Sequence, residues 1–263
     1  QEGDFDPSHV RFLHSTLDEN RSNPGNRVSG LNLGIATNPA FNGYYSMEDM
    51  DIGVLFTTVQ EMSSGQLAVS VLPWMMPMFC VPGVVGPNMY SSNMRVPIDN
   101  TSMMFFRLRW SHQPIPASEM REYVQGGYVY PEMNPGTWKT KANVFNDYEI
   151  DRVAQRNYSF TGIRCFPLQD IAMMENQWGP LADRTKEHLT SADEGIIKIR
   201  RRLIRTARAL AEGVEPTEPW HPEQYCVNRV RMLLPLDADL KSSVEKAKQL
   251  AFQTKQSANY LTL

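Results

Sequence analysis

Residues 52–80 read IGVLFTTVQEMSSGQLAVSVLPWMMPMFC, two runs rich in β-branched and aromatic residues on either side of a Ser-Ser-Gly turn. Such side chains favour strands, and a short turn between two such runs is typical of antiparallel neighbours. A third run of this kind, Ser102–Trp110, follows the turn signal Asp99-Asn100. We therefore predict strands over Ile52–Met62, Gln66–Cys80 and Ser102–Trp110 of one antiparallel sheet.

The clearest helix signal lies further along the chain. Ser191 with Glu194 forms a capping-box pattern, and Gly213 supplies a stop. Between them, apolar residues recur at spacings of three and four at Ile196, Ile199, Leu203, Ala207 and Leu210. We expect this face to cover the sheet. Shorter helices are predicted over Ala117–Val124, Ile171–Trp178 and Asp237–Gln253, and a surface loop over Asp18–Pro39. Strands followed by helices predict an α+β fold.

Five arginines lie on the same helix, namely Arg200, Arg201, Arg202, Arg205 and Arg208. They admit two interpretations, a ligand site or a solvated face with a preference for the negative end of the helix dipole, and we favour the second.

Length and charge narrow the class of protein. The chain has 263 residues and a formal net charge of −3, which argues against nucleic acid or an anionic membrane as a partner. No stretch reaches the roughly 20 apolar residues that a membrane span requires. The three cysteines are scattered, as expected in a reducing cytoplasm. We predict one catalytic domain over residues 1–263, cut from a longer polypeptide because the chain lacks an initiating Met.

A possible metal site lies at the start of the chain, where Asp6, His9 and His14 form a D-x-x-H-x-x-x-x-H pattern. Two histidines and one carboxylate on one face of a metal leave open positions, as in non-haem Fe(II) oxygenases. On a regular helix, however, side chains five residues apart diverge by about 140°. The pattern therefore predicts a locally distorted helix, or a histidine at a helix end.

The remaining ligand must come from a distant segment, and Asp170 is the best candidate because it stands among apolar neighbours at the expected start of a helix. Its alternative role is that of a helix N-cap. For Asp6 we favour a role beside a ligating histidine, where a carboxylate fixes the ring tautomer, over direct metal binding.

A substrate pocket has weaker support. Trp74, Met76 and Met78 belong to a run of soft, bulky side chains that could line an aromatic pocket or form ordinary core. Arg107 and Arg109 alternate along a predicted strand, so they would share a face. They could clamp a carboxylate or face solvent.

Taken together, the motifs resemble those in the catalytic domain of Rieske-type aromatic ring-hydroxylating oxygenase large subunits, closest to the phthalate 4,5-dioxygenase-like group. The resemblance spans roughly residues 1–213. It is carried by EGDFDPSH (2–9) with FLH (12–14), RVPID (95–99), YEIDR (148–152), FTGI (160–163), QD (169–170) and DRTKEHL (183–189).

This resemblance implies a helix-grip fold, an antiparallel sheet packed on a long C-terminal helix. It implies that His9, His14 and Asp170 bind mononuclear Fe(II), and that Asp6 passes electrons to the iron from a [2Fe-2S] Rieske cluster on a neighbouring subunit. Trimers or hexamers, with a reductase or ferredoxin as electron donor, are implied as well. The family's N-terminal Rieske domain, with its C-x-H and C-x-x-H pairs, is absent from this sequence.

The leading functional hypothesis is Fe(II)- and O2-dependent hydroxylation, or oxidative O-demethylation, of an aromatic and carboxylated substrate. Two alternatives remain open. One is a helix-grip ligand-binding module without a catalytic metal. The other is a zinc hydrolase that uses the same three ligands.

Overall fold

The computed structural model describes residues 2–6, 9, 12–15, 43–62, 65–81, 89–111, 113–157, 159–252 and 260–262. Its contacts divide the chain into two compact units. The first, here called the sheet unit, comprises residues 1–5, 41–110 and 189–263, and the second, here called the α4 unit, comprises residues 6–40 and 111–188. A single catalytic domain over 1–263 stays a prediction, and the loop predicted over Asp18–Pro39 lies outside the described residues.

The sheet unit is built on one sheet with the strand order β1-β2-β3-β4-β5-β6, and β7 pairs with β3. Strand β2 pairs antiparallel with β1 and β3, β4 pairs antiparallel with β3 and β5, and β7 pairs antiparallel with β3, whereas β7 and β8 are parallel. The strands are β1 (Gly43–Met50), β2 (Gly53–Glu61), β3 (Gln66–Met75), β4 (Phe79–Cys80), β5 (Met89–Pro97), β6 (Met103–Ser111), β7 (Val230–Pro235) and β8 (Tyr260–Thr262).

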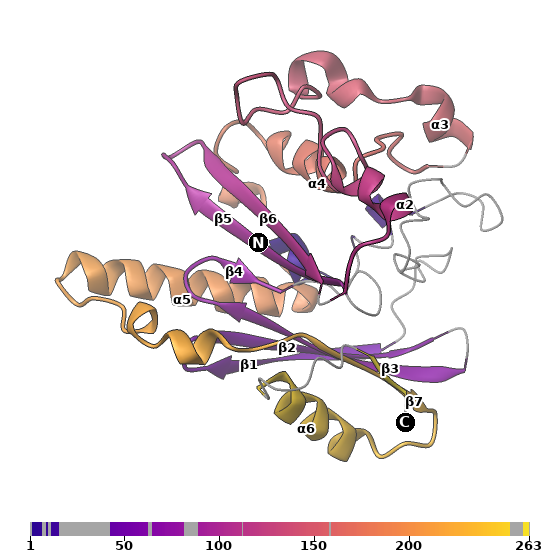
Figure 1. Ribbon diagram of the computed structural model, residues 1–263. Helices are drawn as coiled ribbons and strands as arrows, with labels where there is room; N and C mark the ends of the chain where they lie inside the picture. Colours follow the sequence, from indigo (N-terminus) through magenta and orange to yellow (C-terminus); the bar gives the residue numbers. More distant parts are fainter. Residues whose placement is uncertain are drawn as a thin grey trace. The chain divides into compact units, whose positions relative to one another are not determined.

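Two helices of the sheet unit, α5 (Glu194–Ala211) and α6 (Leu240–Ala251), lie on opposite sides of its strands (Figure 1). Successive residues of β2 point to opposite faces, so Phe56 joins a buried cluster with Ile199 of α5, whereas Leu55 joins another with Ala247 of α6. Each such side chain contributes about 1.5–3 kcal/mol when it is buried. Because both faces are covered, the central strands are almost continuously apolar.

The α4 unit has short helices, α2 (Ala117–Met120), α3 (Arg152–Asn157) and α4 (Phe166–Glu175). Tyr148, Ile163 and Leu168 belong to its buried cluster. Short 3-10 helices complete both units, at Glu2–Asp4, Arg121–Tyr123, Val144–Glu149, Arg184–Lys186, Ser191–Asp193, Glu218–Trp220 and Pro222–Tyr225.

The α+β class and the antiparallel sheet with a long helix are confirmed. The apolar face of α5 covers the sheet as expected at Ile199 and Leu203, but Ala207 and Leu210 of the same predicted face are exposed. Among the described residues, none of the helices combines the length and the apolar character needed to cross a bilayer.

Several boundaries differ from prediction. The run Gln66–Cys80 is divided into β3 and β4 by a turn, and β1 was not predicted because its sequence GYYSMEDM is polar and largely exposed. The capping box lies one residue earlier than predicted, at Thr190 with Asp193. Helix α4 begins at Phe166, five residues before the predicted start, with Pro167 in its first turn. Asp170 is therefore inside the helix, and the alternative that it caps the helix is wrong.

Two of the motif segments meet in the sheet unit. Arg95 of β5 forms an ion pair with Asp4, and Asn93 donates a hydrogen bond of 3.1 Å to the same carboxylate. Burial acts to raise the pKa of the Asp4 carboxyl, but the Arg95 charge and the two hydrogen bonds outweigh it and hold the pKa below its usual value. This ion pair anchors the start of the chain to the sheet.

The close approach of β2 and β3 at Gly53 gives a first prediction. A Cβ at Gly53 would lie 1.9 Å from the backbone oxygen of Trp74, and neither strand can move away without breaking the pairing. We expect Gly53→Ala to lower the free energy of unfolding by about 2 kcal/mol or more, measured by urea denaturation. In the control, Gly195→Ala, the new Cβ meets the mobile end of Met47, so the loss should stay below about 1 kcal/mol. Equal losses would contradict this account of the pairing.

The Asp4–Arg95 ion pair gives a second prediction. Because the folded pKa of Asp4 is depressed, the stabilisation it provides is complete above the ordinary value of 3.8 and is lost as the pH falls through the folded value. Arg95→Met should therefore lower the free energy of unfolding by about 3 kcal/mol at neutral pH, and the difference from wild type should narrow in acid. Lys141→Met, which removes an exposed pair with Glu132, should change stability far less, because solvent screens an exposed ion pair. A difference for Arg95→Met that does not depend on pH would exclude the ion pair as its cause.

Candidate metal centre

Three of the predicted site residues converge within the α4 unit. The Nε2 atoms of His9 and His14 lie 3.5 and 3.3 Å from the same oxygen, Oδ1 of Asp170. One potential ligand atom from each residue lies within 4.8 Å of the other two. Among the described residues, it is His9, His14 and Asp170 that lie close enough together to hold a metal ion.

The backbone around the histidines accommodates their five-residue spacing. His9 has helical backbone, and His14 follows Leu13 in the turn where the described helical residues end. The two rings are 5.5 Å apart and nearly perpendicular. A regular helix would direct these side chains to different sides, so the position of His14 at a helix end is what brings the rings together.

Helix α4 supplies the other half of the site. Phe166, Gln169 and Asp170 are spaced i, i+3 and i+4, so they lie on one face of the helix. All three meet His14. The Phe166 ring stacks on the imidazole at 3.8 Å, the Gln169 Oε1 atom lies 2.7 Å from His14 Nδ1, and Asp170 faces Nε2.

The second ring nitrogen of each histidine is hydrogen bonded away from the site. Nδ1 of His9 lies 2.7 Å from the backbone oxygen of Asp6 and 3.6 Å from its carboxylate. Asp6 is not one of the three grouped residues, which agrees with our preference for a role beside His9. That Asp6 passes electrons stays a prediction.

Electrostatics in the cluster favour a cation. Burial lowers the pKa of His9, but hydrogen bonds and charge from Asp170 and Asp6 outweigh it and raise the pKa to about 9. Burial likewise opposes ionisation of Asp170, yet its contacts with the two histidines hold its pKa well below the usual range. The cluster thus stabilises a carboxylate beside positive charge, and a divalent metal at this position would provide that charge.

The donor set fits a first-row divalent metal. His14 is only 5% exposed, and its buried Nε2 atom has no well-aligned hydrogen-bond partner among the described residues. A buried nitrogen without such a partner is costly in a folded protein unless a ligand engages it. Two imidazole nitrogens and a carboxylate oxygen suit iron, zinc and copper.

The predicted pocket residues belong to the sheet unit. Trp74 and Met76 are fully buried in the cluster that faces α5, and Met78 is half-buried in the turn between β3 and β4. Their position favours ordinary core, and a role in a substrate pocket stays a prediction.

Arg107 and Arg109 share one side of β6, as predicted, and both are half-buried. It is the alternating residues on the other side, Phe106, Leu108 and Trp110, that are exposed. The structure therefore does not support the interpretation of the two arginines as a solvent-facing pair. Whether they clamp a carboxylate is untested.

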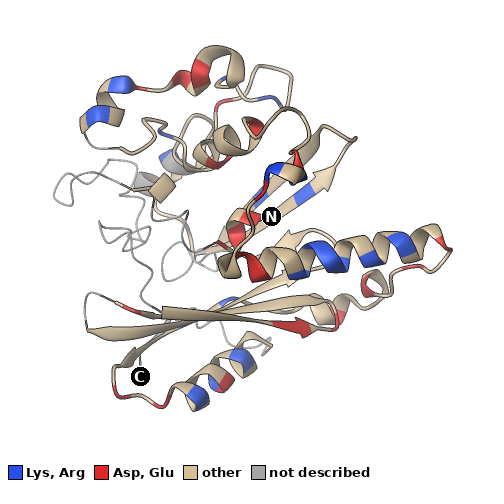
Figure 2. Ribbon diagram, turned by 180° about the vertical axis from the view of Figure 1, so that it is seen from behind, with Lys and Arg blue, Asp and Glu red and all other residues tan. Residues whose placement is uncertain are grey.

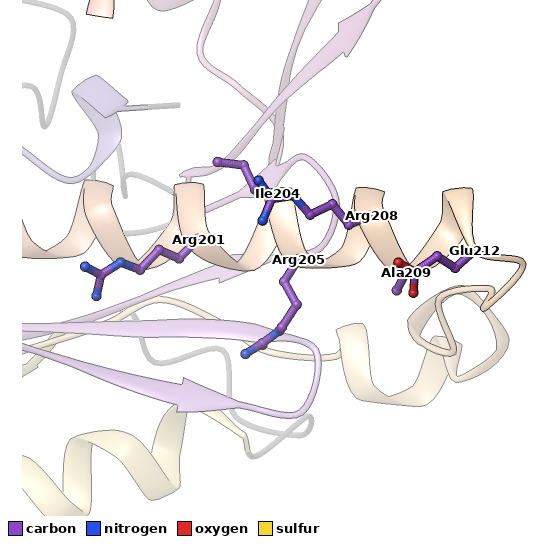
Figure 3. A pocket seen from close by; sticks show the side chains of 6 residues that line it. All are labelled: Arg201, Ile204, Arg205, Arg208, Ala209 and Glu212. Carbon is purple, nitrogen blue, oxygen red and sulfur yellow. The ribbon is translucent and has the colours of Figure 1, made fainter. Parts of the chain in front are cut away.

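Three of the five arginines of α5, Arg201, Arg205 and Arg208, line a groove of about 540 Å³ together with Ile204, Ala209 and Glu212 (Figure 3). The side chains of Arg201 and Arg205 point in different directions in Figure 3. Lys and Arg also recur along much of the helix in Figure 2. The exposed positions of Arg201, Arg205 and Arg208 agree with a solvated basic face, whereas Arg200 pairs with Glu2, and Arg202 is part-buried and donates to the backbone oxygens of Met50 and Gly53. None of the predicted site residues lines the groove.

Comparison with known proteins places the chain in a family. A family model described as "LigXa C-terminal domain like" matches residues 76–251, well over half of the chain. The chain belongs to this family. The match includes α4 with Asp170 but begins after His9 and His14.

The chain is also 34% identical, over 128 residues, to the phthalate 4,5-dioxygenase oxygenase subunit of Pseudomonas putida. The matched part covers 48% of this chain and 29% of that protein, so the chain spans less than a third of the relative's length in this comparison. The resemblance to ring-hydroxylating oxygenase large subunits is confirmed at the level of the family.

Two residues of the site were given no role from sequence. Gln169 was part of a quoted motif and Phe166 was outside the predicted helix. Their spacing relative to Asp170 could have identified them, because residues spaced in this way share one face of a helix. This spacing is informative only once α4 is known to begin at Phe166.

Removal of a ligand gives the third prediction. His14→Ala should reduce Fe(II) binding from about one equivalent to background, measured by anaerobic titration followed by metal analysis, because two donors hold a divalent ion far more weakly than three. His221→Ala is the matched control, since the side chain of His221 is half-exposed and pairs with Glu223, away from the three grouped residues. Retention of stoichiometric iron in His14→Ala would show that the metal binds elsewhere.

Proposed function

We propose that this chain is the part of an aromatic ring-hydroxylating oxygenase that binds mononuclear Fe(II) and carries out hydroxylation or oxidative O-demethylation. The observation that carries the proposal is the His9–His14–Asp170 cluster in a chain similar to the oxygenase subunit of a phthalate dioxygenase. The substrate we propose is an aromatic carboxylate, as the name of that relative suggests.

Three protein donors would leave coordination positions open on the metal, and iron bound there would supply the activation of O2. The residues of the chain have other tasks. His9, His14 and Asp170 hold the metal in place, and Phe166 and Tyr128 form aromatic contacts behind His14.

Burial within the cluster is uneven. His14 is almost completely buried, whereas the side chains of His9 and Asp170 keep 22% and 28% of their exposure. Water is therefore excluded on the His14 side, and small molecules such as O2 have access on the side of His9 and Asp170. An uneven site of this kind suits a reaction that needs both an open coordination position and protection from bulk solvent.

Electrons would have to come from outside this sequence, because none of its three cysteines belongs to a C-x-H or C-x-x-H pair. We propose a [2Fe-2S] Rieske cluster on a neighbouring subunit of a homotrimer or hexamer, reduced by a reductase or ferredoxin in the cytoplasm. Asp6 is suited to connect the two centres because its backbone oxygen and carboxylate lie beside Nδ1 of His9.

We propose Arg107 and Arg109 as the clamp for the carboxylate of the substrate. The half-buried positions of the two arginines support the clamp, since a partly desolvated guanidinium binds a carboxylate more strongly than an exposed one.

The test of this function uses the protein together with a Rieske-bearing partner and a reductase. The fourth prediction is that the anaerobically purified chain holds about one Fe(II), and that ¹⁸O from ¹⁸O2 enters the product of an aromatic carboxylate or the aldehyde released by demethylation. The readout is mass spectrometry of the products after turnover.

Two other results would contradict the proposal. Stoichiometric zinc with hydrolytic activity would identify a hydrolase on the same ligands. Binding of aromatic ligands by a chain that takes up no metal would identify a helix-grip binding module.

A further inference from the structure

Gln169 makes two hydrogen bonds that together fix the orientation of its side-chain amide. Its Nε2 atom donates to the backbone oxygen of Ile163 at 2.7 Å, and its Oε1 atom lies 2.7 Å from Nδ1 of His14. Since a backbone carbonyl can only accept, the nitrogen of the amide must face Ile163. The oxygen must then face His14.

This orientation decides which nitrogen of His14 carries hydrogen. The amide oxygen of Gln169 can only accept, so Nδ1 of His14 must donate to it. In the neutral ring Nε2 then has the free lone pair, and this atom faces Asp170 at 3.3 Å.

We propose that Gln169 is a positioning residue that selects the Nδ1–H tautomer of His14 and holds the ring with Nε2 directed at the metal position. The consequence for metal binding rests on the proposed function, whereas the selection of the tautomer does not.

The surroundings of Gln169 are rigid enough to support this role. Gln169 and Ile163 are both buried, at 4% exposure each. Ile163 follows Gly162, whose φ of +69° favours glycine, and a Cβ at Gly162 would lie 2.5 Å from the backbone oxygen of Asp151. The carbonyl of Ile163 is therefore held in place, and it holds the amide in turn.

His9 is oriented in a different way. Its Nδ1 atom lies 2.7 Å from a backbone oxygen only three residues earlier in the chain. Substitution of a side chain leaves a backbone oxygen present, so His9 does not depend on a remote amide. Of these two histidines, it is His14 whose orientation depends on a remote side-chain amide, so substitution of Gln169 tests the proposal.

The test is the fifth prediction and compares Gln169→Met with wild type in the metal-free protein. Methionine has a similar length but neither accepts from Nδ1 nor donates to Ile163. Long-range ¹H–¹⁵N NMR correlations of histidine-labelled protein, with the ring neutral, should show His14 as the Nδ1–H tautomer in wild type. In Gln169→Met this preference should be lost. A wild-type ring protonated at Nε2, or an unchanged tautomer in Gln169→Met, would overturn the proposal.

Gln169→Glu provides the conservative variant, because a carboxylate still accepts from Nδ1. It should keep the Nδ1–H tautomer of His14. A switch to Nε2–H would overturn the proposal even if Gln169→Met failed to fold. Gln177→Met is the matched control, since Gln177 is exposed on the segment that follows α4 and should leave the His14 signals unchanged.

Metal binding gives a second readout. With Co²⁺ alone as the probe, Gln169→Met should bind the metal about 10–100-fold more weakly than wild type. The unfolding curve of the Gln177→Met control is the reference for the stability of the variant. Wild-type protein that binds neither Co²⁺ nor Fe²⁺ would contradict the proposed function, and the tautomer measurement would still decide the role of Gln169. Equal Co²⁺ affinity in Gln169→Met and wild type would contradict the part of the proposal that concerns the metal.

Discussion

The carboxylate of Asp170 lies against two imidazole nitrogens, and this contact determines how the α4 unit is arranged. Two imidazole rings that face one carboxylate need an element that places this carboxylate between them. Helix α4 does so with one face, which also carries the ring that stacks on His14 and the amide that bonds to its far nitrogen. A displacement of α4 would therefore disturb three contacts of His14 at once, those with Phe166, Gln169 and Asp170.

The sheet unit is constrained by helices on both faces of its central strands. Its strands β2 and β3 are covered on both faces, by α5 and α6, so each strand needs apolar residues at successive positions rather than at alternating ones. Antiparallel sheets often leave one face to solvent, and their strands then alternate. Here the double coverage explains why the run from Ile52 to Cys80 is so continuously apolar.

Much of this was predictable from sequence. Strong local signals, such as the apolar runs of β2 and β3 and the periodicity of α5, identified their elements because most residues of these two strands and the first half of the helix face are buried. Strand β1 escaped prediction because an edge strand gains its place from pairing with β2, not from its own apolar content. The start of α4 was missed because its N-cap residue, Cys165, makes no side-chain capping hydrogen bond.

For the site, His9, His14 and Asp170 were predicted and do converge, although their role as ligands is still a proposal. Gln169 could not be assigned from sequence. Its importance lies in two hydrogen bonds, one with the side chain of His14, far away in the sequence, and one with the backbone oxygen of Ile163, and no local pattern encodes them. Arg107 and Arg109 were placed on a common face correctly, since alternation along a strand depends only on backbone geometry.

The different anchoring of the two histidines has a consequence for folding. His9 obtains its partner from its own turn, whereas His14 and Asp170 meet only after segments 155 residues apart have docked. A metal bound to all three would thus bind the native state and not the unfolded chain, and would stabilise the native state by mass action, by an amount that rises with the logarithm of the free metal concentration above the Kd. Resistance to heat or denaturant would then depend on the free metal concentration, so the same ion that serves the chemistry would also act as a cross-link between the first and middle parts of the polypeptide.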